Sequence, residues 1–417
     1  MPPLLTVARR LRERGHAVTV LSDEANRGDA AAAGLPFRPW RRAPNRPDKS
    51  AASDPVREWE PDNPGGVLGR LLDGVIAGPA EAYARDTLDA IEELAPDVVV
   101  AQELLFGAMA AAERAGVPLA LFTTNVWSFP DGLDQPPFGT GFAPAQSDED
   151  RARDAMVRAV TRQLFDAGRP ALNAAREAIG LEPLAHLLDQ IHAADRILLG
   201  VSRAWDFPAF AAPPERFRYI GPVVSDPGWS AGWTSPWPAD DPRPLVVVSF
   251  STFFQDQADQ IARAIEALAP LPVRAVVTLG PALEPDALRA PEHILVVKSA
   301  SHDALIPEAS LLITHAGHGT AVRAIRHGVP VLALPMGRDQ ADNAARIALR
   351  GAGLRLDAGA SAEAIQGAAR TILSDASYAR AAAALGRAIA EAGDADPVAE
   401  LEAMVGGEGI EPPTLSV

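Results

Sequence analysis

The stretch LLITHAGHGTAVRAIRHGVPVLALPMGRDQADN, residues 311–343, decides the fold of this chain. It opens with a short apolar run, 311–314, which is typical of a buried parallel strand. A loop with two glycines follows, and then a helix that ends at Gly328, a residue favoured just past a helix C-terminus. A second apolar run, 331–334, predicts the next strand. The order strand, glycine loop, helix, strand is typical of an α/β domain with a parallel sheet.

The glycine loop has the features of an anion-binding site. Gly317 and Gly319 lack a Cβ atom, so an anion can approach the backbone closely. The helix that follows presents unpaired N–H groups and the positive end of its dipole. Thr320 can cap the helix or donate its hydroxyl, and His315 can donate from the strand end. We interpret the loop as a diphosphate seat; the alternative is a tight turn whose glycines only permit packing.

An acidic and an amide side chain, Asp339 and Gln340, follow the next strand. Successive strand ends are neighbours along the ligand crevice of a doubly wound sheet. Carboxylate and amide groups there can bind vicinal hydroxyls. A hydroxyl clamp beside a diphosphate seat indicates a nucleotide sugar; the alternative is that Asp339 is only the N-cap of a helix.

The loop THAGHGT, followed by GVP, DQ and N at these spacings, resembles the donor motif of nucleotide-sugar-dependent glycosyltransferases of the GT-B fold. The similarity is closest to the actinobacterial type that glycosylates macrolides and other lipophilic natural products, including antibiotics, and it covers nearly the whole chain. It implies an α/β fold of two Rossmann-like domains that face each other across a cleft. The implied reaction moves a hexose or deoxyhexose from a UDP- or dTDP-sugar to a hydroxyl of a small lipophilic acceptor, with inversion and without a metal.

The loop KSASHDALIP, residues 298–307, resembles the family's base-binding loop. By that resemblance Ala300 would bond the base through its backbone and His302 would lie near the ribose. The family's frequent stacking aromatic is Ser299 here, and its frequent ribose-binding carboxylate is Arg323, so the identity of the nucleotide stays open. The complete set of predicted donor-binding residues is Thr252, Ala300, His302, His315, Gly317, Gly319, Thr320, Asp339 and Gln340.

Composition sets the remaining limits. The length of 417 residues indicates two domains. The net charge of −16 argues against a nucleic-acid surface. The absence of cysteine excludes disulfides and thiolate metal sites. Neither a signal peptide nor an apolar run long enough for a membrane span is evident, so we expect a cytoplasmic protein. We expect no cofactor, because the nucleotide sugar is a co-substrate.

The predicted organisation is an acceptor-binding domain over 1–222, a linker over 223–244 and a donor-binding domain over 245–405. We expect the last helix, 378–391, to cross back to the first domain, and 406–417 to be a disordered tail.

The chain begins with a helix where an α/β domain normally begins with a strand. Members of the family carry a strand and a glycine-rich loop before this helix, so we expect that the start codon is misassigned and that the first strand is missing. Since neighbouring strands lie about 4.8 Å apart, the missing strand would leave a gap of about 9.6 Å lined by unpaired backbone.

Residues 124–144 carry four aromatic side chains, Trp127, Phe129, Phe138 and Phe142, among prolines and glycines. An aromatic-lined loop after a strand end suits an apolar acceptor pocket. The alternative is that the aromatics fix a long loop to its domain.

The catalytic base stays unassigned. The family often uses a histidine from the N-terminal loop, oriented by an aspartate at the end of the strand that reads PDVVVA here. That position is Gln102, and strand alternation predicts that the next residue, Glu103, points to the opposite face. The Asp394-Ala395-Asp396 sequence is interpreted as a solvated turn rather than a metal site.

Three other functions compete. Gly317-x-Gly319 followed by Asp339 mimics a nicotinamide dinucleotide fingerprint, although Val322 occupies the third glycine's place. A non-catalytic nucleotide-sugar-binding or auxiliary partner protein of the same fold is the main alternative. A sugar-nucleotide epimerase of the GT-B fold is the third.

Overall fold

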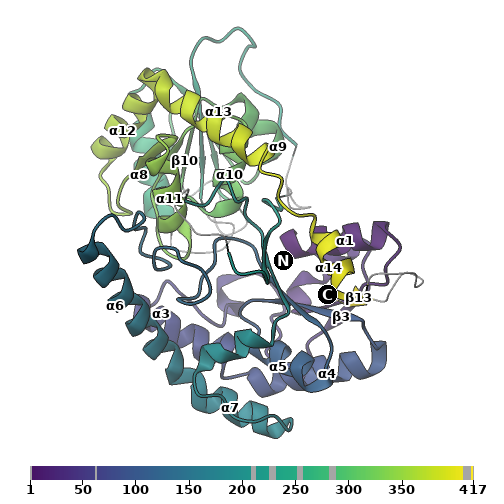
Figure 1. The fold of residues 1–417 in the computed structure, drawn as a ribbon. Helices are drawn as coiled ribbons and strands as arrows, with labels where there is room; N and C mark the ends of the chain where they lie inside the picture. Colours follow the sequence, from purple (N-terminus) through teal and green to yellow (C-terminus); the bar gives the residue numbers. More distant parts are fainter. Residues whose placement is uncertain are drawn as a thin grey trace.

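The computed structural model describes residues 2–61, 63–207, 213–224, 232–250, 257–280, 288–406 and 415–416. Two α/β halves lie one above the other, each built on parallel strands (Figure 1). The helices are α1 (Pro2–Glu13), α2 (Arg27–Ala32), α3 (Pro64–Leu71), α4 (Ala80–Leu94), α5 (Phe106–Ala115), α6 (Asp148–Phe165), α7 (Arg169–Ala178), α8 (Ala258–Leu268), α9 (His302–Leu305), α10 (His318–Arg326), α11 (Gln340–Leu349), α12 (Ala362–Ser374), α13 (Ala376–Ala390) and α14 (Pro397–Met404).

The C-terminal half contains a six-stranded parallel sheet in the order β12-β11-β10-β7-β8-β9. Its strands are β7 (Leu245–Ser249), β8 (Arg274–Thr278), β9 (Ile294–Val297), β10 (Leu311–Thr314), β11 (Val331–Ala333) and β12 (Gly353–Arg355). The chain builds outward from β7 to β9 and then returns to place β10 on the other side of β7. This is the Rossmann order, and its switch point lies between β7 and β10.

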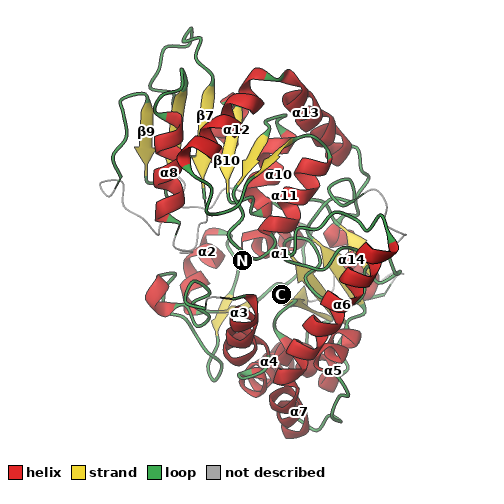
Figure 2. Ribbon diagram, turned by 90° about the vertical axis from the view of Figure 1, so that its left-hand side faces the viewer, coloured by secondary structure: helices red, strands yellow, loops and turns green. Residues whose placement is uncertain are grey.

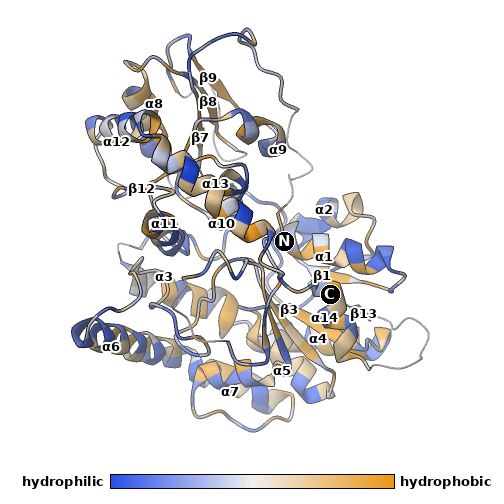
Figure 3. Cartoon of the chain, turned by 45° about the horizontal axis from the view of Figure 1, so that its top comes forward, coloured by the Kyte–Doolittle hydropathy of each residue, from blue (hydrophilic) through white to orange (hydrophobic). Residues whose placement is uncertain are grey.

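Helices cover both faces of this sheet, so its strands are apolar at most positions, and the polar residues lie at the strand ends. Val246 and Val248 pack with α8 and α12, whereas Leu245 and Val247 face the opposite core together with α10 and α13. Figure 2 shows the strands enclosed by helices, and Figure 3 shows that they are largely hydrophobic while much of α6 is hydrophilic. The continuous apolar runs in the sequence follow from this double burial.

The N-terminal half divides its strands between two sheets. A two-stranded sheet holds β1 (Val20–Ser22) and β2 (Phe37–Pro39), and a five-stranded sheet has the order β13-β3-β4-β5-β6. The five strands are β3 (Val98–Gln102), β4 (Leu119–Thr123), β5 (Arg196–Leu199), β6 (Phe217–Tyr219) and β13 (Leu415–Ser416). The two Rossmann-like halves predicted from the sequence are therefore confirmed.

The edge of β3 is where the sequence predicted unpaired backbone. β1 and β2 do not join this sheet, but β13 pairs in parallel with β3, in the register Leu415 to Val98 and Ser416 to Val99. The prediction of a wholly disordered tail is therefore wrong at Leu415–Ser416, whose backbone groups find partners on that edge. Residues 407–414 and 417 lie outside the described residues.

The return to the N-terminal half is made by α14 and not by residues 378–391. α13 packs on α10 and stays with the C-terminal half, whereas Val398 and Leu401 of α14 share a core with Leu11 of α1. Figure 1 shows α14 beside α1, with the two chain ends close together. The prediction for 378–391 is wrong because apolar residues such as Leu385 and Ile389 cover the sheet of their own half.

The two aspartates before α14 secure this return. Asp396 accepts a hydrogen bond from Arg10 at 2.7 Å, and Asp394 accepts one from the backbone N–H of Arg203 at 2.9 Å. The interpretation of Asp394-Ala395-Asp396 as a solvated turn is therefore wrong. His16 adds a contact of 2.8 Å to Glu402. These polar contacts join the C-terminal return to α1, to the connection between α1 and β1, and to the loop after β5.

Close packing of α13 on α10 gives a test of the fold. A Cβ atom on Gly386 of α13 would lie 2.3 Å from the carbonyl oxygen of Ile325 in α10. Gly386→Ala should lower the free energy of unfolding by about 1–3 kcal/mol, because neither backbone can yield easily. Gly367→Ala, in an exposed turn of α12 where a Cβ atom meets nothing, should be neutral or stabilise the protein by up to about 1 kcal/mol. Thermal denaturation of both variants checks this, and equal melting temperatures would contradict the packing.

Candidate functional site

The glycine loop lies at the switch point of the C-terminal sheet. It connects β10, which pairs with β7, to the N-terminus of α10, and Gly317 is the N-cap residue of that helix. A Cβ atom on Gly317 would lie 2.5 Å from Nε2 of His315, whereas one on Gly319 would meet nothing within 4 Å. Gly317 is therefore required by the histidine ring beside it, and Gly319 leaves open space above the first turn of the helix. An anion can use that space.

His315 is buried at the end of β10, where the sequence predicted it. Its Nδ1 lies 3.3 Å from Oγ1 of Thr314, and its ring stacks against Phe250 with centroids 6.1 Å apart. Burial, helped by the charge of Arg338, lowers the pKa of His315 to about 3. The ring is therefore neutral near pH 7 and retains one N–H donor.

Asp339 lies at the start of α11, but its carboxylate does not cap that helix. It accepts a hydrogen bond of 2.6 Å from Nδ2 of Asn343, which also donates to the carbonyl oxygen of Ala316 in the glycine loop at 3.0 Å. Burial raises the pKa of Asp339. The structure thus connects the acidic residue to the loop and disfavours the simple N-cap alternative.

Gln340 plays a different part from the one predicted. Its Oε1 accepts hydrogen bonds from the backbone N–H groups of Met336 at 2.7 Å and Gly337 at 3.1 Å. The amide oxygen therefore shapes the turn between β11 and α11 instead of standing open beside Asp339.

The remaining predicted donor residues surround the ends of β7 and β8. Nε2 of His302 lies 3.2 Å from Oγ of Ser249, the last residue of β7, and 3.4 Å from Oγ1 of Thr278. Ala300 is buried, and Thr320 is half-buried in the first turn of α10. Thr252 lies outside the described residues. The structure brings the described members of the predicted set to the carboxyl end of one sheet.

Arg323 is the residue that the sequence resemblance places at the position of a family carboxylate. Its guanidinium is mostly buried and pairs with Asp303 of α9 at 2.7 Å. The arginine thus holds α9, which carries His302, against α10.

A cavity of about 990 Å³ lies in the N-terminal half. Its lining includes residues of α1 and of the strand ends β1 and β3, the segment 38–68 and the loop after β4, and it is completed by Met336, Gly337 and Arg338 of the C-terminal half. The turn that precedes Asp339 therefore forms part of the cavity wall, and the cavity adjoins the donor motif.

The aromatic loop 124–144 both lines the cavity and is fixed to its domain. Phe129 and Phe138 line the cavity. Trp127 is buried and packs edge-on against Phe217 at 5.1 Å, and Phe142 lies under the guanidinium of Arg153 at 4.0 Å. Four further aromatic residues line the cavity and were not predicted: Trp40, Trp59, Tyr83 and Phe165. Trp40 and Trp59 lie in a stretch rich in proline and charged residues that is typical of a surface loop, and Tyr83 and Phe165 lie in helices.

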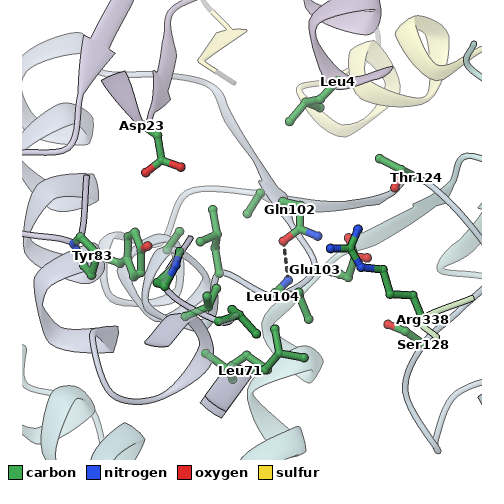
Figure 4. A pocket seen from close by; sticks show the side chains of 18 of the residues that line it. Leu4, Asp23, Leu71, Tyr83, Gln102, Glu103, Leu104, Thr124, Ser128 and Arg338 are labelled. Atoms are coloured by element: carbon green, nitrogen blue, oxygen red, sulfur yellow. Dashed lines mark hydrogen bonds between the residues drawn. The ribbon is translucent and has the colours of Figure 1, made fainter. Parts of the chain in front are cut away.

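Glu103 lines the cavity, so the prediction that it points away is wrong. Strand β3 ends at Gln102, and a turn follows in which the N–H of Leu105 donates to the carbonyl oxygen of Gln102 at 3.0 Å. Side-chain alternation therefore ends at this point, and both Gln102 and Glu103 belong to the lining (Figure 4). The side chain of Gln102 is already engaged, because its Oε1 accepts from the N–H of Leu104 at 2.9 Å.

Polar contacts hold the two halves together around the site. Arg338 forms a two-point ion pair with Glu58, with distances of 2.8 and 2.6 Å. Asp342 of α11 accepts from the backbone N–H groups of Gly139 at 2.7 Å and Gly141 at 2.9 Å. Arg346 and Asp206 form a buried pair at 2.5 Å. α11 thus fixes the aromatic loop of the opposite half.

Among the described residues, no cluster of three or more histidine, aspartate or glutamate side chains has the arrangement of a metal site. No helix in the described ranges is both long and apolar enough to cross a membrane.

Comparison with known proteins agrees with this geometry. The family profile described as UDP-glucoronosyl and UDP-glucosyl transferase matches residues 192–398. The 4'-demethylrebeccamycin synthase of Lentzea aerocolonigenes is 30% identical over 372 residues, which cover 85% of this chain and 84% of that protein.

Solved structures share the fold. The glycotransferase of kitacinnamycin superposes with a TM-score of 0.74 at 22% identity, covering 97% of this chain and 95% of the other. The spinosyn rhamnosyltransferase SpnG complexed with thymidine diphosphate has a TM-score of 0.64 at 21% identity, covering 97% and 98%.

A glycine-loop site in one Rossmann-like half, beside a large cavity in the other, defines a GT-B glycosyltransferase. The chain belongs to the UDP-glucoronosyl and UDP-glucosyl transferase family. The resemblance drawn from residues 311–343 is confirmed.

The contact of Asp342 with the aromatic loop can be tested directly. Asp342→Ala removes the acceptor of two backbone N–H groups, a loss on the order of 2 kcal/mol. Amide hydrogen exchange over residues 137–142 should become faster. Glu92→Ala, which removes an exposed carboxylate from α4, should leave that exchange unchanged. Equal exchange in both variants would show that the loop is held by other contacts.

Proposed function

We propose that this glycosyltransferase moves a hexose or deoxyhexose from a UDP- or dTDP-sugar to a hydroxyl of a small lipophilic natural product, with inversion and without a metal. The observation that carries the proposal is the position of the turn 336–339. Its first three residues line the 990 Å³ cavity, and its last, Asp339, is linked through Asn343 to the glycine loop. A donor seated on that loop therefore meets an acceptor that fills the cavity.

The donor side is supported by the open space at Gly319 and by the N-terminus of α10. The first N–H groups of a helix carry a partial positive charge, which favours a diphosphate. The chain's net charge of −16 supplies no general attraction for anions, so binding must rely on such local donors. The thymidine diphosphate bound by SpnG supports a nucleoside diphosphate in this half.

The acceptor side is supported by the size and lining of the cavity. A volume of about 990 Å³ is at the upper end of small-molecule sites, which run to roughly 1,000 Å³. Its tryptophan, tyrosine and phenylalanine side chains suit a flat or macrocyclic apolar molecule. The name of the rebeccamycin-forming relative supports a natural-product acceptor.

Metal independence is proposed because fixed donors can stabilise the departing diphosphate. Helix N–H groups and the neutral His315 are held in place by the fold, so they need no reorganisation when charge develops. Inversion follows if the acceptor hydroxyl attacks from the cavity, opposite the diphosphate.

The rival functions make different predictions. A nicotinamide enzyme lacks support, because Val322 is fully buried in the place of the third glycine. A non-catalytic nucleotide-sugar-binding or auxiliary partner protein is favoured by one observation: Gln102 stands where the family has an orienting carboxylate, and its oxygen is bound to Leu104. Product analysis with and without an aglycone separates a transferase from this alternative and from an epimerase. The cytoplasmic location stays a prediction.

Sugar-nucleotide binding tests the donor site. His315→Ala and Asp339→Ala should each weaken the affinity for UDP- or dTDP-sugars by about tenfold, the loss of one hydrogen bond of about 1.4 kcal/mol. Titration calorimetry measures this. His327→Ala, at the exposed opposite end of α10, is the matched control and should bind like the wild type. Unchanged affinity in both site variants would refute the proposed seat.

A further inference from the structure

Four carboxylates line the cavity: Asp23, Asp54, Glu58 and Glu103. Asp23 pairs with Arg46 at 2.9 Å, and Glu58 pairs with Arg338. Asp54 accepts from the backbone N–H groups that follow it, including that of Val56 at 2.8 Å. The other three carboxylates are each stabilised by a cation or by backbone N–H groups of other residues. Among the described residues, Glu103 of the cavity wall has neither kind of partner.

The Oε2 atom of Glu103 is buried and has no hydrogen-bond partner in the described part of the protein. A buried acceptor left unpaired costs about 1–3 kcal/mol. The Glu103 side chain lines a cavity large enough for a ligand, although Oε2 itself is covered, so a small rotation of the carboxylate brings it within reach of a donor on that ligand. A hydroxyl group has the required chemistry.

Glu103 also lies at the end of the cavity that adjoins the donor motif. The cavity wall beside it includes Arg338, and the charge of the next residue, Asp339, acts on the Glu103 carboxyl group. Figure 4 shows Gln102, Glu103 and Arg338 along one side of the cavity. A hydroxyl bound to Glu103 is therefore placed next to the sugar that the donor motif would hold.

We infer that Glu103 is the general base that deprotonates the acceptor hydroxyl. This inference rests on the proposed function. The hydroxyl oxygen forms a bond to the anomeric carbon as its proton passes to the carboxylate of Glu103. The bond from that carbon to the diphosphate oxygen breaks, and the nucleoside diphosphate leaves with the electron pair. The proton returns to solvent after the product departs.

The surroundings of Glu103 suit this role at physiological pH. Burial raises the pKa of Glu103 to about 7. The hydroxyl of Thr123 on β4 acts in the opposite direction, and the charge of Asp339 adds to the increase in the pKa. The base is therefore ionised above about pH 7 and protonated below it, so the rate should fall on the acid side.

Turnover of Glu103→Gln tests the inference. The amide keeps the shape of the side chain but accepts no proton, so kcat should fall by roughly 10²–10⁴-fold while donor affinity stays unchanged. The acid limb of the pH–rate profile near pH 7 should disappear in the residual activity. Glu363→Gln, the same change on exposed α12, is the control and should match the wild type. Full turnover of Glu103→Gln with an intact acid limb would overturn the inference.

A second measurement needs no transfer reaction. The fluorescent phenol 7-hydroxycoumarin reports its own protonation state in its excitation spectrum. Bound in the wild-type cavity at pH 7, it should show a weaker phenolate band than when it is bound to Glu103→Gln. The Glu103 carboxylate accepts a hydrogen bond from the phenol, and its negative charge disfavours a second anion beside it. The same spectrum in both proteins would overturn the role of Glu103. Absence of sugar transfer by the wild type from any UDP- or dTDP-sugar would overturn the proposed function, and the phenol would still decide for or against Glu103.

Discussion

One fully buried amide, Asn343, is the constraint on which the site depends. Its Oδ1 accepts from the indole N–H of Trp205 at 3.2 Å, and its Nδ2 donates both to the carbonyl oxygen of Ala316 and to Asp339. A single side chain thereby fixes the glycine loop, the acidic residue and the N-terminal half. Ala316 has a left-handed backbone with φ of 67°, which is costly for a residue with a Cβ atom, and the bond to Asn343 helps to hold it there.

The other contacts of α11 extend this arrangement across the two halves. Asp342 holds the aromatic loop, and Arg346 forms a buried pair with Asp206, which also accepts from the hydroxyl of Tyr219 at 2.7 Å. Such buried charges are stable only with complete partners. One helix therefore sets the position of the donor motif relative to the cavity, and the polar residues that follow the motif in sequence serve this alignment as well as the ligand.

The sheet of the C-terminal half and its glycine loop could be predicted because local chemistry determines them. Strands buried on both faces form continuous apolar runs, and a Cβ atom at Gly317 would collide with the ring of His315. The place of Glu103 in the cavity wall could not be predicted from the sequence. Alternation along β3 applies only while the strand continues, and the turn after Gln102 redirects Glu103. The oxygen of Gln340 accepts hydrogen bonds from backbone N–H groups of the turn before α11, and residue spacing does not reveal such contacts. The return through α14 depends on contacts with α1, and β13 pairs with β3; both join segments far apart in the chain, for which the sequence carries no local pattern.

The ion pair between Arg338 and Glu58 has a consequence for the wall of the cavity. Arg338 itself has φ of 54°, and its side chain is 42% exposed while that of Glu58 is 15% exposed. Dissolved ions compete with a pair that reaches solvent, and their screening strengthens as the Debye length falls from about 10 Å at 0.1 M to about 3 Å at 1 M. Both residues line the cavity, so added salt should loosen the hold of the turn 336–339 on the segment around Glu58.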